Sequence, residues 1–283
     1  MINEGTIKLR DGRSLGYAQY GDLAGKPVFH FHGSGGSRLE HPLDESILID
    51  LKIRLISADR PGHGLSDFQP DRKLLDWPDD VLQLADHLEI DTLYVLGWSA
   101  GGPYALACAY KLKERVLAGA IVSGFAPPDR PDPAEGFSLF PRLFMFSARH
   151  FHLLIKLFRK MAYSQVSGGK EIKIDGLINQ DRNILDNPEN YRLFMADIRE
   201  GYRQGWQGIA LDDIIINNPW GFSLVDIQIR IDIWQGERDQ NVPLNHGKYQ
   251  HEKIPNNRFT VVQNQAHLYL LSHWRDVLIA LTG

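Results

Sequence analysis

The sequence predicts an α/β fold, with a mostly parallel sheet of eight strands, helices on both of its faces and a helical insertion. Short apolar runs alternate with helical patterns at both ends of the chain, as expected of a parallel sheet covered on both faces. This alternation stops near Pro127 and resumes near Val225, with no convincing strand in between. The length of 283 residues is sufficient for one large domain that carries such an insertion.

The expected strands are eight short runs, of which the first two form a hairpin around Asp11-Gly12. They are Thr6–Leu9, Ser14–Tyr20, Pro27–His32, Arg54–Ala58, Leu93–Gly97, Val116–Val122, Ile229–Gln235 and Arg258–Val262. Between the fourth and fifth runs, Asp79–Leu88 has apolar residues at the i, i+3, i+4, i+7 spacing of one helix face, namely Val81, Leu84, Ala85 and Leu88. Another helix is expected at the Ser99 turn, because three alanines that follow suit close packing on a sheet, namely Ala105, Ala107 and Ala109.

The interruption of the strand pattern divides the chain into three parts. Residues 1–126 are expected to form the first part of the core, residues 127–224 a helical cap or lid, and residues 225–283 the remainder of the core. The middle part has aromatic-rich helical patterns. We interpret it as an insertion between two strands of one core.

Composition excludes several classes of protein. The formal net charge of −4 lacks the basic excess that is usual in nucleic-acid-binding proteins. Cys108 is the only cysteine, which excludes an intrachain disulfide and a cysteine zinc site. The opening MINEGTIKLRDG has no signal-peptide pattern, and no apolar run approaches the roughly 20 residues of a membrane span. We therefore expect a cytoplasmic protein without stable membrane insertion, and without a metal or organic cofactor.

The segment GWSAGG places three glycines and an alanine around Ser99, directly behind the apolar run Leu93 to Leu96. Small residues suit a very sharp strand-to-helix turn, which holds the serine in a strained backbone conformation with its hydroxyl exposed. An exposed serine hydroxyl is a weak nucleophile until a base removes its proton and a third group orients that base.

His267 and Asp239 are the expected partners of Ser99. His267 follows the last predicted strand by a few residues, and Asp239 follows the strand before it. Loops after parallel strands meet at the same edge of a sheet, which is also the edge of the Ser99 turn. The chain order serine, aspartate, histidine is the one expected of a nucleophile elbow. Asp129, after an earlier strand, is the alternative acid, and Glu237 is a further neighbour.

A glycine-rich turn, HGSGGSRLE, ends the third predicted strand. Backbone N–H groups in fixed positions can stabilise the negative charge that develops on a carbonyl oxygen. We expect the N–H groups of Ser34 and Ala100 to form this oxyanion hole. Gly33, Trp98 and Phe144 are expected to contact the substrate.

Five motifs together resemble the α/β-hydrolase superfamily in their order and spacing. They are HGSGGSRLE, DRPGHGLSD, GWSAGG, GERDQNVP and NQAH, and the match extends from about residue 5 to the end of the chain. The resemblance implies the α/β-hydrolase fold with a cap at the usual insertion point. It also implies that Ser99 is the nucleophile, Asp239 the acid and His267 the base, with Ser34 and Ala100 as the oxyanion donors.

Three other histidines are interpreted as structural. His63 is expected to support the DRPGHG loop, in which Asp59 and Arg60 are tied into a turn. His30 and His32 are expected to support the oxyanion loop. Their i, i+2 spacing would suit a metal ion, but no acidic or cysteine partner adjoins them.

The stretch Phe137–Lys160 combines apolar and basic residues and contains no Asp or Glu. Its basic residues are Arg142, Arg149, Lys156, Arg159 and Lys160. Its apolar residues fit one helical face and are Phe140, Leu143, Phe144, Phe151, Leu154, Ile155 and Phe158. One interpretation is a cap helix that buries this face over the active site. The other is contact with a lipid surface or with an amphiphilic, anionic substrate.

The serine at the turn excludes haloalkane dehalogenases and epoxide hydrolases of this fold, which need a carboxylate there. GWSAGG is similar to the corresponding segment of cofactor-free haloperoxidases, and HGSGGSR and the cap resemble proline iminopeptidase-like proteins. We expect a serine hydrolase that cleaves an ester or related acyl bond of a small, apolar substrate through an acyl-enzyme on Ser99.

Three alternatives use the same residues. The first is a ligand-binding or signalling protein with slow turnover, and the second is a C–C bond hydrolase that acts on diketones. The third is an aminopeptidase, which needs acidic residues in the cap to hold a substrate ammonium. Glu135, Asp197 and Glu200 are the candidates for that role.

Overall fold

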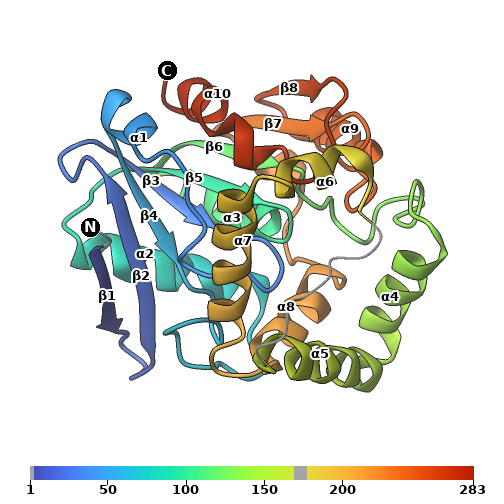
Figure 1. Cartoon of the computed structure of the whole chain (residues 1–283). Coiled ribbons are helices and arrows are strands. Elements are labelled where there is room, and N and C mark those ends of the chain that lie inside the picture. Colours follow the sequence, from blue (N-terminus) through green and yellow to red (C-terminus); the bar gives the residue numbers. More distant parts are fainter. Residues whose placement is uncertain (1–2, 169–176) are drawn as a thin grey trace.

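The computed structural model describes residues 3–168 and 177–283, which contain one sheet of eight strands in the order β1-β2-β4-β3-β5-β6-β7-β8 (Figure 1). The pairs β1–β2 and β2–β4 are antiparallel, and all other neighbouring strands are parallel. The predicted fold class is therefore confirmed. The strands are β1 (Asn3–Lys8), β2 (Ser14–Gly21), β3 (Lys26–Phe31), β4 (Ile53–Ala58), β5 (Leu93–Trp98), β6 (Val116–Val122), β7 (Arg230–Gly236) and β8 (Asn257–Val262).

Helices cover both faces of the sheet. One face packs with α2 (Trp77–His87), α3 (Gly101–Lys111) and α9 (Leu244–Lys253), and the other with α1 (Ser46–Asp50) and α10 (Leu270–Thr282). Short 3₁₀ helices precede α2 at Leu74–Asp76 and β7 at Leu224–Asp226. The strands between these two layers are apolar on both sides because both of their faces are buried.

The described residues between β6 and β7 form five α-helices, the short 3₁₀ helix before β7 and no strand. The five α-helices lie beyond the carboxyl ends of the central strands (Figure 1). Residues 169–176 of the expected insertion lie outside the described residues. No described helix has both the length and the apolar character needed to cross a bilayer. We refer to these five helices as the cap: α4 (Leu139–His150), α5 (His152–Ser167), α6 (Asn179–Leu185), α7 (Pro188–Gly201) and α8 (Gln207–Ile216).

The prediction of one continuous apolar helical face across residues 137–160 is wrong. Phe151 has non-helical backbone angles (φ −132°, ψ 62°) and separates α4 from α5. A single helix over these residues would be roughly 36 Å long. The break lets Ala148 of α4 and Ile155 of α5 pack in one cluster with α8. Most of the other predicted apolar residues are exposed, including Phe151, which is 51% exposed.

Candidate active site

Ser99 lies in the sharp turn between β5 and α3, with a φ of +53°. A side chain at Gly97 would collide with the backbone of Gly101, and one at Gly101 would collide with the carbonyl oxygen of Phe31 at the end of β3. The glycines therefore allow the turn to form and bring it against the neighbouring strand. The Ser99 N–H donates to the carbonyl oxygen of Val122 (2.9 Å), which fixes the turn on β6.

The structure brings Ser99, His267 and Asp239 into one hydrogen-bonded chain, although they follow three different strands. His267 Nε2 lies 2.9 Å from Ser99 Oγ, and His267 Nδ1 lies 2.8 Å from Asp239 Oδ2. All three residues are buried. The Trp98 ring stacks on the imidazole with a centroid separation of 5.6 Å, and Trp98 Nε1 donates to the His267 carbonyl oxygen.

Asp239 is held firmly in its loop. Its Oδ1 accepts from the backbone N–H groups of Asn241 and Val242, both at 2.9 Å, and its Oδ2 accepts from Gln235 Nε2 as well as from His267. The two other acids considered at this edge do not contact His267 within the described part of the chain. Asp129 is exposed, and Glu237 accepts from the Asn264 N–H.

The surroundings of His267 favour its protonated form overall. Burial is the largest single effect and disfavours the imidazolium, but Asp239, Asp181 and Glu40 together outweigh it and raise the pKa of His267 above its ordinary value of 6.5. An imidazole of this kind, between a hydroxyl and a carboxylate, can take up the hydroxyl proton and hold it as imidazolium.

The expected oxyanion donors lie on the two segments that meet at this turn. Ser34 follows β3, and Ala100 precedes the first residue of α3. Among the described residues neither N–H has an acceptor, so both are available to a substrate oxygen. Gly35, with a φ of +73°, gives the loop a backbone conformation that favours glycine.

Three aspartates of the cap hold the glycine-rich loop, which we define as residues 33–37. Asp197 of α7 accepts from the N–H and the hydroxyl of Ser37, both at 2.7 Å. Asp212 of α8 binds Arg60, which donates to the carbonyl oxygens of His32 (2.6 Å) and Gly33 (3.0 Å).

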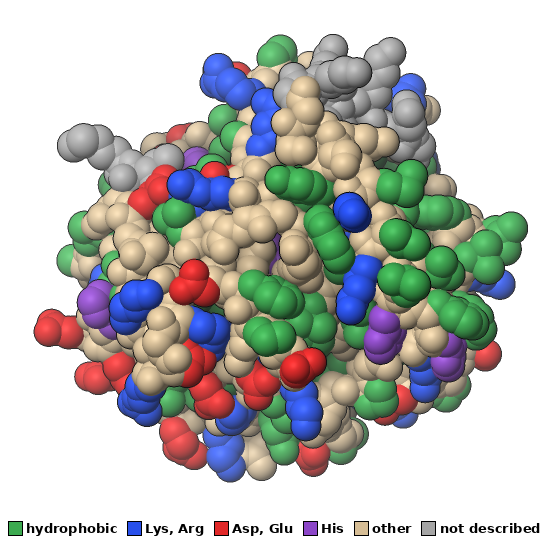
Figure 2. All heavy atoms as spheres, turned by 90° about the horizontal axis from the view of Figure 1, so that it is seen from below, with side chains coloured by type: hydrophobic (Ala, Val, Ile, Leu, Met, Phe, Trp, Pro, Cys, Tyr) green, Lys and Arg blue, Asp and Glu red, His purple; other side chains and the backbone are tan. Residues whose placement is uncertain are grey.

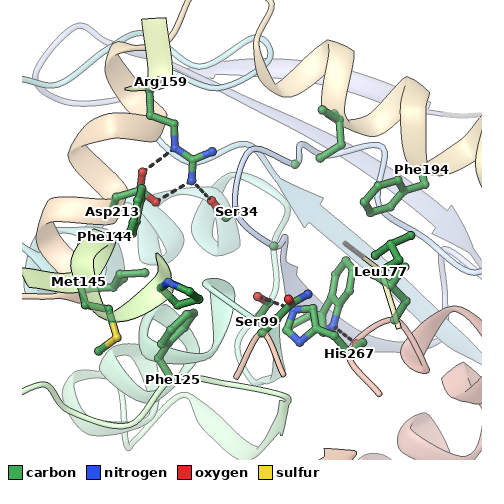
Figure 3. Close-up of a pocket in the computed structure, with 18 of the residues that line it drawn as sticks. Ser34, Ser99, Phe125, Phe144, Met145, Arg159, Leu177, Phe194, Asp213 and His267 are labelled. Atoms are coloured by element: carbon green, nitrogen blue, oxygen red, sulfur yellow. Dashed lines mark hydrogen bonds and ion pairs between the residues drawn. The ribbon is translucent and has the colours of Figure 1, made fainter. Parts of the chain in front are cut away.

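The third aspartate acts through an arginine. Asp213 of α8 forms a two-point ion pair with Arg159 of α5, at 2.6 and 2.9 Å, and Arg159 Nη2 donates to Ser34 Oγ at 2.8 Å (Figure 3). Arg159 is the one basic residue of the segment 137–160 that contacts the glycine-rich loop among the described residues. It is turned inward because Asp213 provides a buried counter-charge.

The contacts of His63 in the DRPGHG loop, and of His32 in the neighbouring loop, fit their interpretation as structural residues. His63 and His32 are buried against each other and beside Arg60, which links them to Asp212. Burial and the charge of Arg60 lower the pKa of His32 well below its ordinary value. Arg72 also contacts Asp212. Burial alone would raise the pKa of Asp212, but Arg72 and Arg60 hold that pKa well below its usual range.

The expectation that no acidic residue adjoins His30 and His32 is wrong, because Glu40 folds back onto β3. Its Oε1 lies 2.5 Å from His30 Nε2, and its Oε2 accepts from the Gly33 N–H at 3.1 Å. Burial raises the pKa of Glu40 above its ordinary value and lowers that of His30, so it disfavours the charged form of both groups. No cluster of three or more His, Cys, Asp or Glu suited to a metal ion occurs in the described ranges.

A cavity of about 410 Å³ opens above Ser99 and His267 (Figure 3). The predicted contact residues Gly33, Trp98 and Phe144 all line it. Most of its apolar wall comes from the cap, including Phe140, Met145, Phe158, Leu185, Phe194 and Ile198, and Leu177 before α6 adds to it. Such a wall suits an apolar group attached to the atom that Ser99 would attack.

Of the three carboxylates considered for holding an ammonium, only Asp197 lines the cavity. Burial and the nearby Glu40 raise the pKa of Asp197 well above its ordinary value. Glu200 forms ion pairs with Arg38 and Arg203, and Glu135 binds Asn245. Sequence reasoning missed five polar residues of the cavity wall, namely Glu40, Arg159, Asp213, Asn217 and Asn241.

Comparison with known proteins agrees with this architecture. The family described as alpha/beta hydrolase fold matches residues 26–273. A protein of Bacillus subtilis (strain 168), described as the uncharacterized hydrolase YcgS, is 26% identical over 269 residues, which cover 92% of this chain and 90% of that protein.

Solved structures with the same fold include an esterase from Exiguobacterium antarcticum and a bromoperoxidase from Bacillus anthracis. The esterase has a TM-score of 0.74 and 18% identity, and the match covers 98% of this chain and 97% of the esterase. The bromoperoxidase has a TM-score of 0.71 and 23% identity, and the match covers 99% of this chain and 98% of the bromoperoxidase. The family match, the eight-stranded sheet and the serine turn after β5 lead to one conclusion: the chain belongs to the α/β hydrolase fold family.

Proposed function

We propose that the protein is a serine hydrolase that cleaves ester bonds of small, largely apolar substrates. The observation that carries this proposal is the chain from Ser99 Oγ through His267 to Asp239, with links of 2.9 and 2.8 Å, at the base of an apolar cavity. Among the matches, the hydrolase from Bacillus subtilis and the Exiguobacterium antarcticum esterase support a hydrolytic role.

The reaction proceeds in two halves. Ser99 Oγ attacks the carbonyl carbon of the ester while His267 Nε2 takes the hydroxyl proton, and the carbonyl oxygen becomes an oxyanion bound by the N–H groups of Ser34 and Ala100. When the carbon–oxygen bond breaks, the departing alcohol oxygen takes the proton from His267. Water then gives a proton to His267 and attacks the acyl-enzyme. The acid is released as Ser99 Oγ regains that proton.

Asp239 acts throughout by position and charge. Its Oδ2 accepts the Nδ1–H of His267, which leaves Nε2 free to accept the Ser99 proton. Its negative charge stabilises the imidazolium that forms during both halves of the reaction, which agrees with the raised pKa of His267.

An aminopeptidase is the alternative that a specific observation favours, because Asp197 lines the cavity. Its Oδ1 already accepts two hydrogen bonds from Ser37, and burial together with the nearby Glu40 raises its pKa well above its ordinary value, which disfavours its charged form. A carboxyl whose charged form is disfavoured is a poor counter-ion for an ammonium group. These contacts favour the esterase over the aminopeptidase.

A substrate panel tests the proposal. It compares p-nitrophenyl esters of increasing acyl length with aminoacyl p-nitroanilides and with a diketone, for the wild-type protein and Ser99→Ala. Ester turnover that disappears in Ser99→Ala supports the proposal. Faster turnover of the anilides or the diketone would contradict it, as would tight ester binding without turnover.

A further inference from the structure

Helices α4 and α5 present most of the exposed apolar surface of the described chain. Among the described residues, ten of the seventeen exposed large hydrophobic side chains lie between positions 139 and 161. They are Leu139, Phe140, Leu143, Phe146, Phe151, Leu153, Leu154, Leu157, Phe158 and Met161. Surface apolar residues scattered singly need no explanation, whereas a concentration of this kind marks an interaction surface.

Only a narrow stripe of α5 packs inward. Ile155 and Val166 are buried, and Arg159 lies between them on the same side of the helix. The remaining surface of α5 includes Leu153, which is 68% exposed, and Met161, which is 67% exposed. Both helices therefore retain an outward apolar face that the described part of the chain leaves uncovered.

The same face is basic. Arg142, Arg149, Lys156 and Lys160 are exposed on it, and residues 137–160 contain no Asp or Glu, in a chain with a net charge of −4. Figure 2 shows hydrophobic side chains gathered with Lys and Arg among them on the side where α4 and α5 lie. Two copies that met through this face would bring like charges together. An anionic surface would instead attract these basic side chains.

We propose that the α4–α5 face docks on an anionic lipid surface. The cavity wall continues into this face, because Phe140 and Phe158 line the cavity and are also 63% and 39% exposed. Docking therefore places the cavity mouth at the lipid boundary. Apolar ester substrates would then reach the site from the lipid. This second step rests on the proposed function, whereas docking itself does not.

Cosedimentation with vesicles tests the docking. The vesicles contain phosphatidylcholine alone or phosphatidylcholine and phosphatidylglycerol in equal parts, and Ser99→Ala is measured beside the wild-type protein so that binding is separated from catalysis. We expect binding to the anionic vesicles only. Lys156→Glu with Lys160→Glu should weaken it on the order of 100-fold, and Leu153→Ser or Leu157→Ser about tenfold each. Lys113→Glu and Leu23→Ser, which are exposed on other parts of the surface, are the matched controls and should bind as the wild type does.

Three outcomes would overturn the docking proposal. They are the absence of binding to anionic vesicles, binding that the α5 variants leave unchanged, and a dimer in sedimentation velocity that those variants abolish without any vesicle binding. Equal turnover of p-nitrophenyl acetate by all docking variants would show that they are folded, because none of the changed residues lines the cavity.

A second inference follows from the contact of Arg159 with the glycine-rich loop and rests on the proposed function. We propose that Arg159 is a positioning residue that orients the oxyanion donor Ser34. The guanidinium is fixed by its two-point pair with Asp213, and Nη2 donates to Ser34 Oγ at 2.8 Å. Because this contact holds the Ser34 side chain, the cap also fixes the direction of the Ser34 N–H.

A double-mutant cycle tests this role. If Arg159 acts through Ser34 Oγ, Ser34→Ala and Arg159→Met should each lower kcat about tenfold with little change in KM, and the double variant should be no worse than either one. Losses that multiply to about 100-fold, a change confined to KM, or single variants with wild-type kcat would each overturn it. Loss of turnover in Ser99→Ala separates this test from that of the proposed function.

Discussion

Replacing Asp239 by Asn should reverse the hydrogen-bond direction along the whole chain to Ser99. In the wild-type protein Oδ1 accepts from two backbone N–H groups, those of Asn241 and Val242, and Oδ2 faces His267 Nδ1. An asparagine keeps its oxygen toward the two backbone donors and directs its NH₂ group at Nδ1. Nδ1 must then accept, so the imidazole proton moves to Nε2, where it faces Ser99 and blocks proton uptake.

The size of this preference follows from the contacts. Turning the amide oxygen toward His267 would leave two N–H groups without an acceptor, whereas the opposite orientation leaves only one N–H of Gln235 Nε2 without one, at about 1–3 kcal/mol for each group. The unproductive orientation is thus favoured by about 1–3 kcal/mol, which corresponds to a population ratio of roughly 5 to 160. The loss of the carboxylate charge that stabilises the imidazolium adds to this effect. We expect kcat/KM to fall on the order of 10³- to 10⁴-fold.

The assay is kcat/KM for p-nitrophenyl acetate, with thermal unfolding as the check on folding. Asp129→Asn is the matched control, because that carboxylate is exposed and does not contact His267, and it should remain within about twofold of the wild type. If Asp239→Asn keeps a tenth of the activity, or if Asp129→Asn loses more, the assignment of the acid is refuted.

The other predictions concern the nucleophile, pH, the cavity wall and metal ions. Ser99→Ala should lower turnover by about 10⁴-fold or more while thermal unfolding stays near wild type; a mutant with a tenth of the activity would contradict this. Because the pKa of His267 is raised, kcat/KM should increase with pH as the imidazolium loses its proton, with a midpoint above 6.5. In Asp239→Asn the midpoint of this pH profile should fall, because His267 stays buried while the carboxylate that raises its pKa is lost. An unchanged midpoint would show that Asp239 does not raise the pKa of His267. Phe144→Ser should reduce kcat/KM for octanoyl esters more than for acetyl esters, whereas Phe151→Ser, which lies outside the cavity wall, should affect neither; equal losses on both esters would contradict the role of Phe144. EDTA should leave activity unchanged, and a loss that a divalent ion restores would contradict the mechanism.

The core of the fold could be predicted because its signals are local. Buried strands appear as short apolar runs, and the expected ends of all eight lie within three residues of the observed ends. The Ser99 turn was recognisable from GWSAGG, because the close approach of Gly97 and Gly101 to neighbouring backbone leaves no room for side chains.

The cap and the support of the site were not predictable in the same way. Arg159 looks like one more surface cation until α8 brings Asp213 beside it, 54 residues later in the chain. Glu40 folds back onto His30 through a loop of irregular backbone, whose path leaves no periodic signal. On either side of the break at Phe151, Ala148 and Ile155 pack with α8, and the pattern of the segment itself does not reveal these partners.

Labelling with a fluorophosphonate, followed by mass spectrometry of the protein and its peptides, tests the central claim most directly. Ser99 Oγ should displace fluoride from phosphorus, with its proton taken up by His267, and form one stable adduct. The proposed function predicts a single adduct on Ser99 that is absent in Ser99→Ala and forms far more slowly in Asp239→Asn. An ester-hydrolysing protein in which Ser99 stays unlabelled, or in which the adduct lies on another residue, would contradict it.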